Sequence, residues 1–182
     1  MGDLTIQGKS TRTQYSLALA LHRLFATLGE KMTEEQFISE EDLEIVDSIY
    51  SDLLDVEDIS NLAELEKIVF LVESYNMEIN SGLDFIQWYR WSEPAQLKET
   101  PAALKTIGLT NSYEICMEAL KITFPNGLPE TADDKDGAID SLEDDDEKEN
   151  IRDRLVGLAE KQEDQNYNLT TGLAAWIRNN TK

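Results

Sequence analysis

Apolar residues recur along most of this chain at the spacing of one face of an α-helix, and no segment shows convincing strand-type alternation. The first stripe predicts a helix that ends at Gly29. Its apolar positions are Leu17, Leu21, Leu24, Phe25 and Leu28. A second helix is predicted to begin near Ser39, whose hydroxyl can cap it, with Asp42 as the acidic member of a capping box. The inward face of this second helix is Leu43, Val46, Tyr50, Leu53 and Leu54.

Further stripes predict more helices, separated by short breaks. A third helix is expected to open at Ser60 and to end where Asn80, Ser81 and Gly82 interrupt the pattern. A short aromatic segment over residues 85–91 ends before Pro94, and Pro101 is expected to open a short helix that ends at Gly108. Helical stripes also cover residues 113–124, 151–158 and 169–177.

These stripes predict an all-α fold, an irregular bundle of about seven to eight helices in a single domain over residues 1–182. Hydrophobic residues form 41% of the chain, too many for a disordered protein, and the length allows a buried core. No run reaches the roughly 18 apolar residues of a membrane span. The single Cys116 suits a reducing compartment, so a cytoplasmic protein is expected.

Acidic residues outnumber basic ones by 37 to 16, and the excess is concentrated in two tracts. Residues 30–78 hold sixteen acids against Lys31 and Lys67, and residues 130–149 hold eleven against Lys135 and Lys148. The formal net charge of −21 opposes compaction, so a chain that keeps it is expected to use the electric field. Such a surface attracts basic proteins and repels nucleic acid and anionic membranes. We therefore expect a basic protein partner, with no direct binding of nucleic acid or membrane.

On a helical wheel of the second predicted helix, the carboxylates lie opposite the apolar face. Neighbours at i, i+3 and i+4 are about 5–6 Å apart, and duplex DNA presents a comparably dense row of roughly one charge per 1.7 Å of axis. Because basic partners at i+4 are missing, this face is predicted to enter a groove that holds phosphates, with an ordinary solvated face as the alternative. The predicted partner-binding residues are Glu41, Glu44, Asp47, Asp52, Asp55 and Asp58.

The second tract, residues 130–149, is predicted to be an acidic loop or the start of a helix. Its predicted partner-binding residues are Asp133, Asp134, Asp136, Asp140, Asp144, Asp145 and Asp146. Part of it aligns with an EF-hand loop whose calcium ligands would be Asp134, Asp136, Asp140 and Glu143. Position 1 of that loop is Ala132 rather than an acid, and the preceding segment, with Pro125 and Pro129, cannot form the entering helix. We therefore expect no metal and no other cofactor.

No residue pattern typical of catalysis is found, so a non-enzymatic protein is expected. His22, the sole histidine, lies on or beside the first apolar stripe, and Cys116 occupies a core-type position. The chain has no phosphate-binding glycine loop, no Gly-x-Ser-x-Gly elbow and no zinc-type pair of cysteines or histidines. The aromatic residues of segment 85–91 are expected to pack the core, because a base-stacking platform needs a basic groove.

Residues 78–89, 102–109 and 119–129 are three segments whose motifs resemble those of the DNA mimic protein 19 family. Residues 78–89 are similar to its Asn-Gly-Gly-Phe-x-x-Phe/Tyr-Tyr-Asn segment, residues 102–109 to its Ala-Leu-x-x-Ile-Gly-Ala segment, and residues 119–129 to its Ala-x-x-x-Phe-Pro-x-Gly-x-Pro turn. Departures are Ser81 in place of a second glycine, Arg90 in place of asparagine, and a more acidic insert after Pro129. The resemblance implies an all-α fold whose surface acids imitate duplex DNA and occupy the DNA-binding site of a transcription factor.

Charge and resemblance together predict a non-enzymatic DNA mimic, a monomer or homodimer, that binds a basic DNA-binding protein such as a transcription regulator and blocks its access to DNA. Two alternatives remain open. One is an immunity protein that neutralises a basic nuclease toxin, which would use the same electrostatics. The other is a calcium-binding or structural acidic protein.

Overall fold

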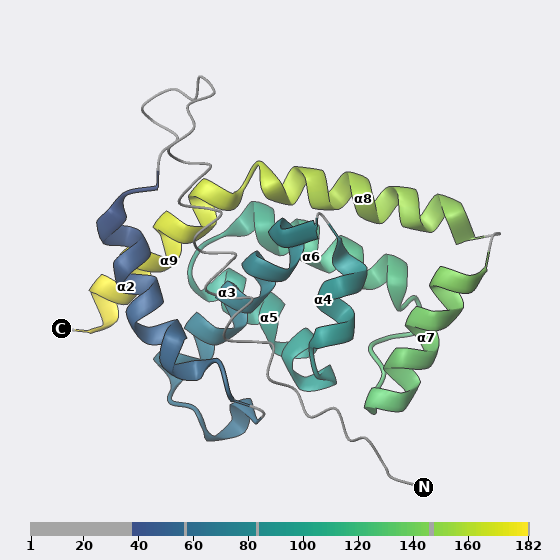
Figure 1. Cartoon of the computed structure of the whole chain (residues 1–182), viewed down its shortest axis with the longest axis horizontal. Helices are drawn as coiled ribbons and strands as arrows, with labels where there is room; N and C mark the ends of the chain where they lie inside the picture. Colours follow the sequence, from purple (N-terminus) through teal and green to yellow (C-terminus); the bar gives the residue numbers. More distant parts are fainter. Residues whose placement is uncertain (1–37, 57, 83, 146–147, 182) are drawn as a thin grey trace, which may run out of the picture. The chain divides into compact units, whose positions relative to one another are not determined.

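The computed structural model describes residues 38–56, 58–82, 84–145 and 148–181, which belong to one compact unit. These residues form eight α-helices and no strand, so the all-α fold class is confirmed (Figure 1). The first predicted helix and His22 lie outside the described residues. A single domain over residues 1–182 therefore stays a prediction.

The central helix is α3, which packs against α2, α4, α5, α8 and α9. In chain order the elements are α2 (Glu40–Tyr50), η2 (Ser51–Leu53), η3 (Ile59–Asn61), α3 (Glu64–Gly82), α4 (Phe85–Trp91), α5 (Pro94–Thr106), α6 (Thr110–Thr123), α7 (Ala132–Asp144), α8 (Glu149–Glu163) and α9 (Asn166–Asn180). Helices α2 and α9 pack together at one end of the unit, and α7 packs on α4, α6 and α8 at the other (Figure 1).

An aromatic cluster fills the core between α3 and α4, as the sequence predicts. Tyr75 of α3 meets the edge of Trp88 with ring centroids 4.9 Å apart, and Tyr89 meets Phe124 at 5.3 Å. The prediction is wrong for Trp91, which is 72% exposed. Trp91 is the last residue of α4 and lies on the side of the helix opposite to the buried residues, so it cannot reach the core.

A buried polar chain ties α3, α6 and α8 together. The Tyr75 hydroxyl donates to Gln162 Oε1 at 3.0 Å, and Gln162 Nε2 donates to Ser112 Oγ at 3.2 Å. Gln162 is fully buried, so its amide needs both partners. These bonds fix how α8 sits on the two helices beneath it.

Two predicted helix boundaries are confirmed by their caps. Ser39 Oγ accepts from the Asp42 N–H at 3.1 Å, which starts α2 one residue later. After α5, Gly108 has a φ of 82°, and the Leu109 N–H bonds back to the Leu104 carbonyl at 3.0 Å. This is the glycine-terminated helix end that the sequence predicts.

Two predicted starts are wrong. Helix α3 begins at Glu64 rather than Ser60, because Ser60 belongs to η3, whose first turn is capped by Asp58. Helix α5 begins at Pro94, so Pro101 lies inside it. Both prolines suit a first helical position, but Glu93 and Gln96 form a capping box only around Pro94.

Candidate partner-binding surface

The acids of α2 and η2 form an exposed row on the side away from the core. We call this set the acidic row: Glu40, Glu41, Glu44, Asp47, Asp52 and Asp55. Val46, Tyr50 and Leu53 are buried beneath it, as predicted, whereas Leu43 and Leu54 are only half-buried. All members of the row are exposed except Asp47, which is half-buried. Because α2 ends at Tyr50, Asp52 lies in η2 and Asp55 in the turn that follows, not on the continuous helix of the sequence analysis.

Among the described residues, counter-charge reaches only the first turn of α2. Arg178 of α9 lies 2.6 Å from Asp42 Oδ1 and 3.5 Å from Glu41 Oε1. Asp42 is therefore held by Arg178 and does not complete the capping box with Ser39. In the part of the chain that the structure describes, Glu44, Asp47, Asp52 and Asp55 have no ion pair. These four acids of the row therefore have no counter-ion among the described residues.

Asp58, also predicted to bind a partner, has a structural task in the fold. It is exposed, and its carboxylate accepts from the Ser60 N–H at 2.8 Å and from Asn61 Nδ2 at 3.2 Å. The hydrogen bonds from Ser60 lower the pKa of this carboxyl. Asp58 therefore stabilises the start of η3 as an N-cap.

Glu73 of α3 is a further acid of this region that the sequence analysis missed. It is half-buried, and burial is the main cause that raises its pKa to about 7. The negative charge of Asp47 raises this pKa further, whereas the hydrogen bond from Asn76 opposes the rise. Asp47 and Glu73 are therefore electrostatically coupled, which links an acid of α3 to the acidic row. In the sequence, Glu73 comes directly after Val72 of the apolar stripe of α3. Its burial and its proximity to Asp47 depend on how α2 packs on α3, which the sequence does not show.

The second tract differs, because residues 132–144 form the regular helix α7 and three of its acids, Asp136, Asp140 and Glu143, have cationic partners. Arg90 of α4 lies 2.8 Å from Asp140 and also pairs with Glu143. Lys135, buried within α7, lies 3.3 Å from Asp136. These pairs compensate two of the acids predicted to bind a partner, Asp136 and Asp140.

Charged side chains also stabilise the two ends of α7. At the N-terminus, Thr131 Oγ1 accepts from the Asp134 N–H, so Asp133 and Asp134 lie in the first turn, where they complement the helix dipole. At the C-terminus, Arg152 donates to the Leu142 carbonyl at 2.8 Å. Lys148 lies 3.5 Å from Asp145. Asp144 is the last residue of α7, and Asp146 lies outside the described residues.

The EF-hand alternative does not fit this geometry. Asp134, Asp136, Asp140 and Glu143 all belong to α7, so they follow a helix and cannot wrap around an ion as loop residues do. Two of the four carboxylates are occupied by Arg90. Across the described ranges, no group of three or more potential metal-ligating side chains is found.

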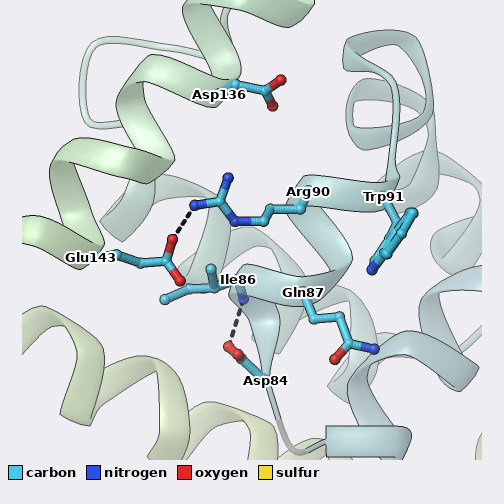
Figure 2. A pocket seen from close by; sticks show the side chains of 7 residues that line it. All are labelled: Asp84, Ile86, Gln87, Arg90, Trp91, Asp136 and Glu143. Atoms are coloured by element: carbon cyan, nitrogen blue, oxygen red, sulfur yellow. Dashed lines mark hydrogen bonds and ion pairs between the residues drawn. The ribbon is translucent and has the colours of Figure 1, made fainter. Parts of the chain in front are cut away.

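A groove of about 460 Å³ separates α4 from α7 (Figure 2). It is lined by Asp84, Ile86, Gln87, Arg90, Trp91, Asp136 and Glu143. Figure 2 shows the Arg90 side chain directed toward Glu143, with Trp91 and Gln87 on the other side of it. The pattern of the sequence does not indicate this groove, because its walls come from segments about fifty residues apart.

The two predicted rows do not form one surface. Helices α2 and α7 lie at opposite ends of the described unit in Figure 1. The structure therefore brings together the α2 and η2 acids and separates them from Asp133 to Asp145. A partner that covers the acidic row need not contact α7.

Cys116 has the environment of a structural thiol. It is fully buried in α6, and burial raises the pKa of its thiol. A thiol that does not ionise is a poor nucleophile. Among the described residues, no helix has the length and apolar character that crossing a bilayer requires.

Comparison with known proteins identifies a family whose model matches this chain. Residues 60–180 match the DMP19-like protein family, a stretch that contains α3 to α9 and begins after the acidic row. No curated protein and no solved structure matches the chain significantly. The match covers most of the chain and includes the three segments whose motifs resemble the DNA mimic protein 19 family. The chain belongs to the DMP19-like family, a family of DNA mimics.

Proposed function

We propose that this protein is a non-enzymatic inhibitor whose acidic row enters the DNA-binding groove of a basic protein, such as a transcription regulator, and blocks its access to DNA. One observation carries the proposal. Glu44, Asp47, Asp52 and Asp55 have no ion pair with any described residue, whereas in α7 Asp136, Asp140 and Glu143 are each paired with a cation. The family's DNA mimicry and the net charge of −21 support the same function.

Keeping these charges uncompensated opposes folding. Two carboxylates about 5.5 Å apart repel by roughly 0.8 kcal/mol at the dielectric constant of water, before salt screening. A cationic groove would replace this repulsion with attraction. Binding is therefore expected to be fast and to weaken steeply as salt concentration rises.

Helix α7 has a smaller part in this proposal. Asp133 and Asp134 are exposed and have no ion pair within the described ranges, so they add to the long-range field. Asp136, Asp140 and Asp145 are already paired, and a partner would have to displace Lys135, Arg90 or Lys148 to reach them. We therefore assign the specific contact to the acidic row.

The experiment compares two variants that lose the same number of charges. The partner is first captured from native lysate at low salt and released at high salt, and its DNA complex is followed by band shift. The row variant carries Glu44→Gln, Asp47→Asn, Asp52→Asn and Asp55→Asn. The control carries Asp153→Asn, Glu160→Gln, Glu163→Gln and Asp164→Asn, at exposed positions in and after α8.

If each row charge contributes about 0.5 kcal/mol, the row variant should compete roughly 30-fold less well, whereas the control should compete nearly as well as the native chain. Equal competition by both variants would refute the assignment of the row. A captured nuclease whose cleavage is blocked, without competition for a DNA-binding site, would instead support the immunity-protein alternative.

A further inference from the structure

The groove between α4 and α7 contains a feature that the acidic row does not explain. Trp91 is 72% exposed, whereas the other aromatic residues of α4 are buried. An exposed indole exposes a large apolar area to water, and tryptophan is enriched where proteins make their strongest contacts with partners. The groove beside it has a volume of about 460 Å³.

We propose that this groove binds an arginine side chain of the basic partner, with the guanidinium stacked on the Trp91 indole. The site rests on the proposed function, since it needs a basic partner, and it deepens that function by naming a second contact. It lies away from the acidic row, so each contact can be removed without the other.

The charge of the groove favours a cation. Four carboxylates, those of Asp84, Asp136, Asp140 and Glu143, lie in or beside it. They face two cations, Arg90 and Lys135. Arg90 is held by Asp140 and Glu143, and these carboxylates raise the pKa of its guanidinium. Lys135 is 3% exposed and turned toward the end of α4. The surplus charge that remains is negative.

The polar neighbour of Trp91 favours arginine over lysine. Gln87 precedes Trp91 by one helical turn, so their Cβ atoms are about 5–6 Å apart. Gln87 Nε2 donates to Glu78 Oε2 at 2.9 Å and to Ser81 Oγ at 3.1 Å, which fixes the amide. Its Oε1 accepts no hydrogen bond from a described residue. A planar guanidinium can stack on the indole and donate sideways to such an acceptor, whereas an ammonium cannot stack in this way.

Oligo-arginine and oligo-lysine peptides of equal length test this site, because they carry the same charge and differ in the head group. Binding is measured by titration calorimetry at low salt on the full chain, for the native protein, Trp91→Ala and Trp91→Phe. Val156→Ala is the matched control, since Val156 is an exposed apolar residue of α8 outside the groove.

The native chain should bind oligo-arginine about fivefold more tightly than oligo-lysine, the size of a cation–π contact. Trp91→Ala should abolish this preference without changing the oligo-lysine affinity, Trp91→Phe should keep part of it, and Val156→Ala should keep all of it. An unchanged preference in Trp91→Ala overturns the groove site.

The same titrations separate the two proposals. Loss of the arginine preference in the row variant but not in Trp91→Ala overturns the groove site and leaves the proposed function standing. If neither peptide binds at low salt, both the groove site and the electrostatic attraction behind the proposed function are refuted.

Discussion

Glu73 provides a quantitative test of how the folded chain tolerates charge beside the acidic row. Its carboxyl is half-buried near Asp47, and its pKa is raised from 4.5 to about 7. Below pH 4.5 the group is protonated in both the folded and the unfolded chain. As pH rises from 4.5 to 7, the unfolded chain loses this proton and the folded chain keeps it, so the free energy of unfolding falls.

The size of the effect follows from the difference in pKa. One pKa unit corresponds to about 1.4 kcal/mol, so a rise from 4.5 to about 7 costs roughly 3 kcal/mol of stability above pH 7. Glu73→Gln removes the charge and keeps an oxygen that can accept from Asn76. This variant should therefore be more stable than the native chain by up to roughly 3 kcal/mol at pH 8, and nearly equal to it at pH 4.5.

Urea unfolding followed by circular dichroism across this pH range measures both free energies. Glu114→Gln is the control, because Glu114 is exposed on α6, and its difference from the native chain should be small at every pH. Asp47→Asn should reduce the pH dependence, since Asp47 contributes to the raised pKa of Glu73. A Glu73→Gln variant that shows the same pH dependence as the native chain would refute the reasoning.

Three other predictions concern the fold. Lys135→Met removes a buried ammonium that donates to the Arg90 and Ser92 carbonyls, so it should lower the free energy of unfolding in urea by about 2 kcal/mol. The control Lys98→Met, at an exposed position, should lower it by less than about 0.5 kcal/mol. Gln162→Leu should cost about 2–3 kcal/mol in the same assay, because it leaves two buried hydroxyls without this partner, and an unchanged midpoint would contradict it. Gly108→Ala should lower the melting temperature, because the positive φ of Gly108 costs an alanine about 1 kcal/mol. Gly157→Ala, inside α8, should raise the melting temperature. If both variants shift the melting temperature in the same direction, the backbone argument is contradicted.

The sequence predicts the helices of this protein well where the apolar stripe and a cap coincide. Ser39 and Gly108 mark helix ends for reasons that act within a few residues. The prediction fails at α5, where two prolines compete for the same position. Pro94 wins because Glu93 and Gln96 cap the helix around it, a local signal that was present in the sequence.

Whether each acid has a counter-ion could not be predicted from the sequence alone. The helical wheel correctly places Glu44 and Glu41 on the exposed side of α2. It cannot show that Arg178 compensates Glu41, or that Arg90 compensates Asp140, because these pairs join helices that are distant in the chain. Periodicity gives the face on which a carboxylate lies. Only the fold decides whether that carboxylate has a counter-ion.

Carboxylates therefore have two different roles in this chain: some form ion pairs within the fold, and others have no counter-ion among the described residues. In α7, Asp140 and Glu143 pair with Arg90, and Lys135 donates to the Arg90 and Ser92 carbonyls, so these contacts attach the helix to α4. Beyond the first turn of α2, no described cation forms an ion pair with the acidic row, and Glu73 of α3 adds a further acid near Asp47. Acids without a counter-ion lower stability by mutual repulsion, and Glu44, Asp47, Asp52 and Asp55 are in this state among the described residues. The uncompensated segment is therefore where an external cation, rather than an internal one, is the expected partner.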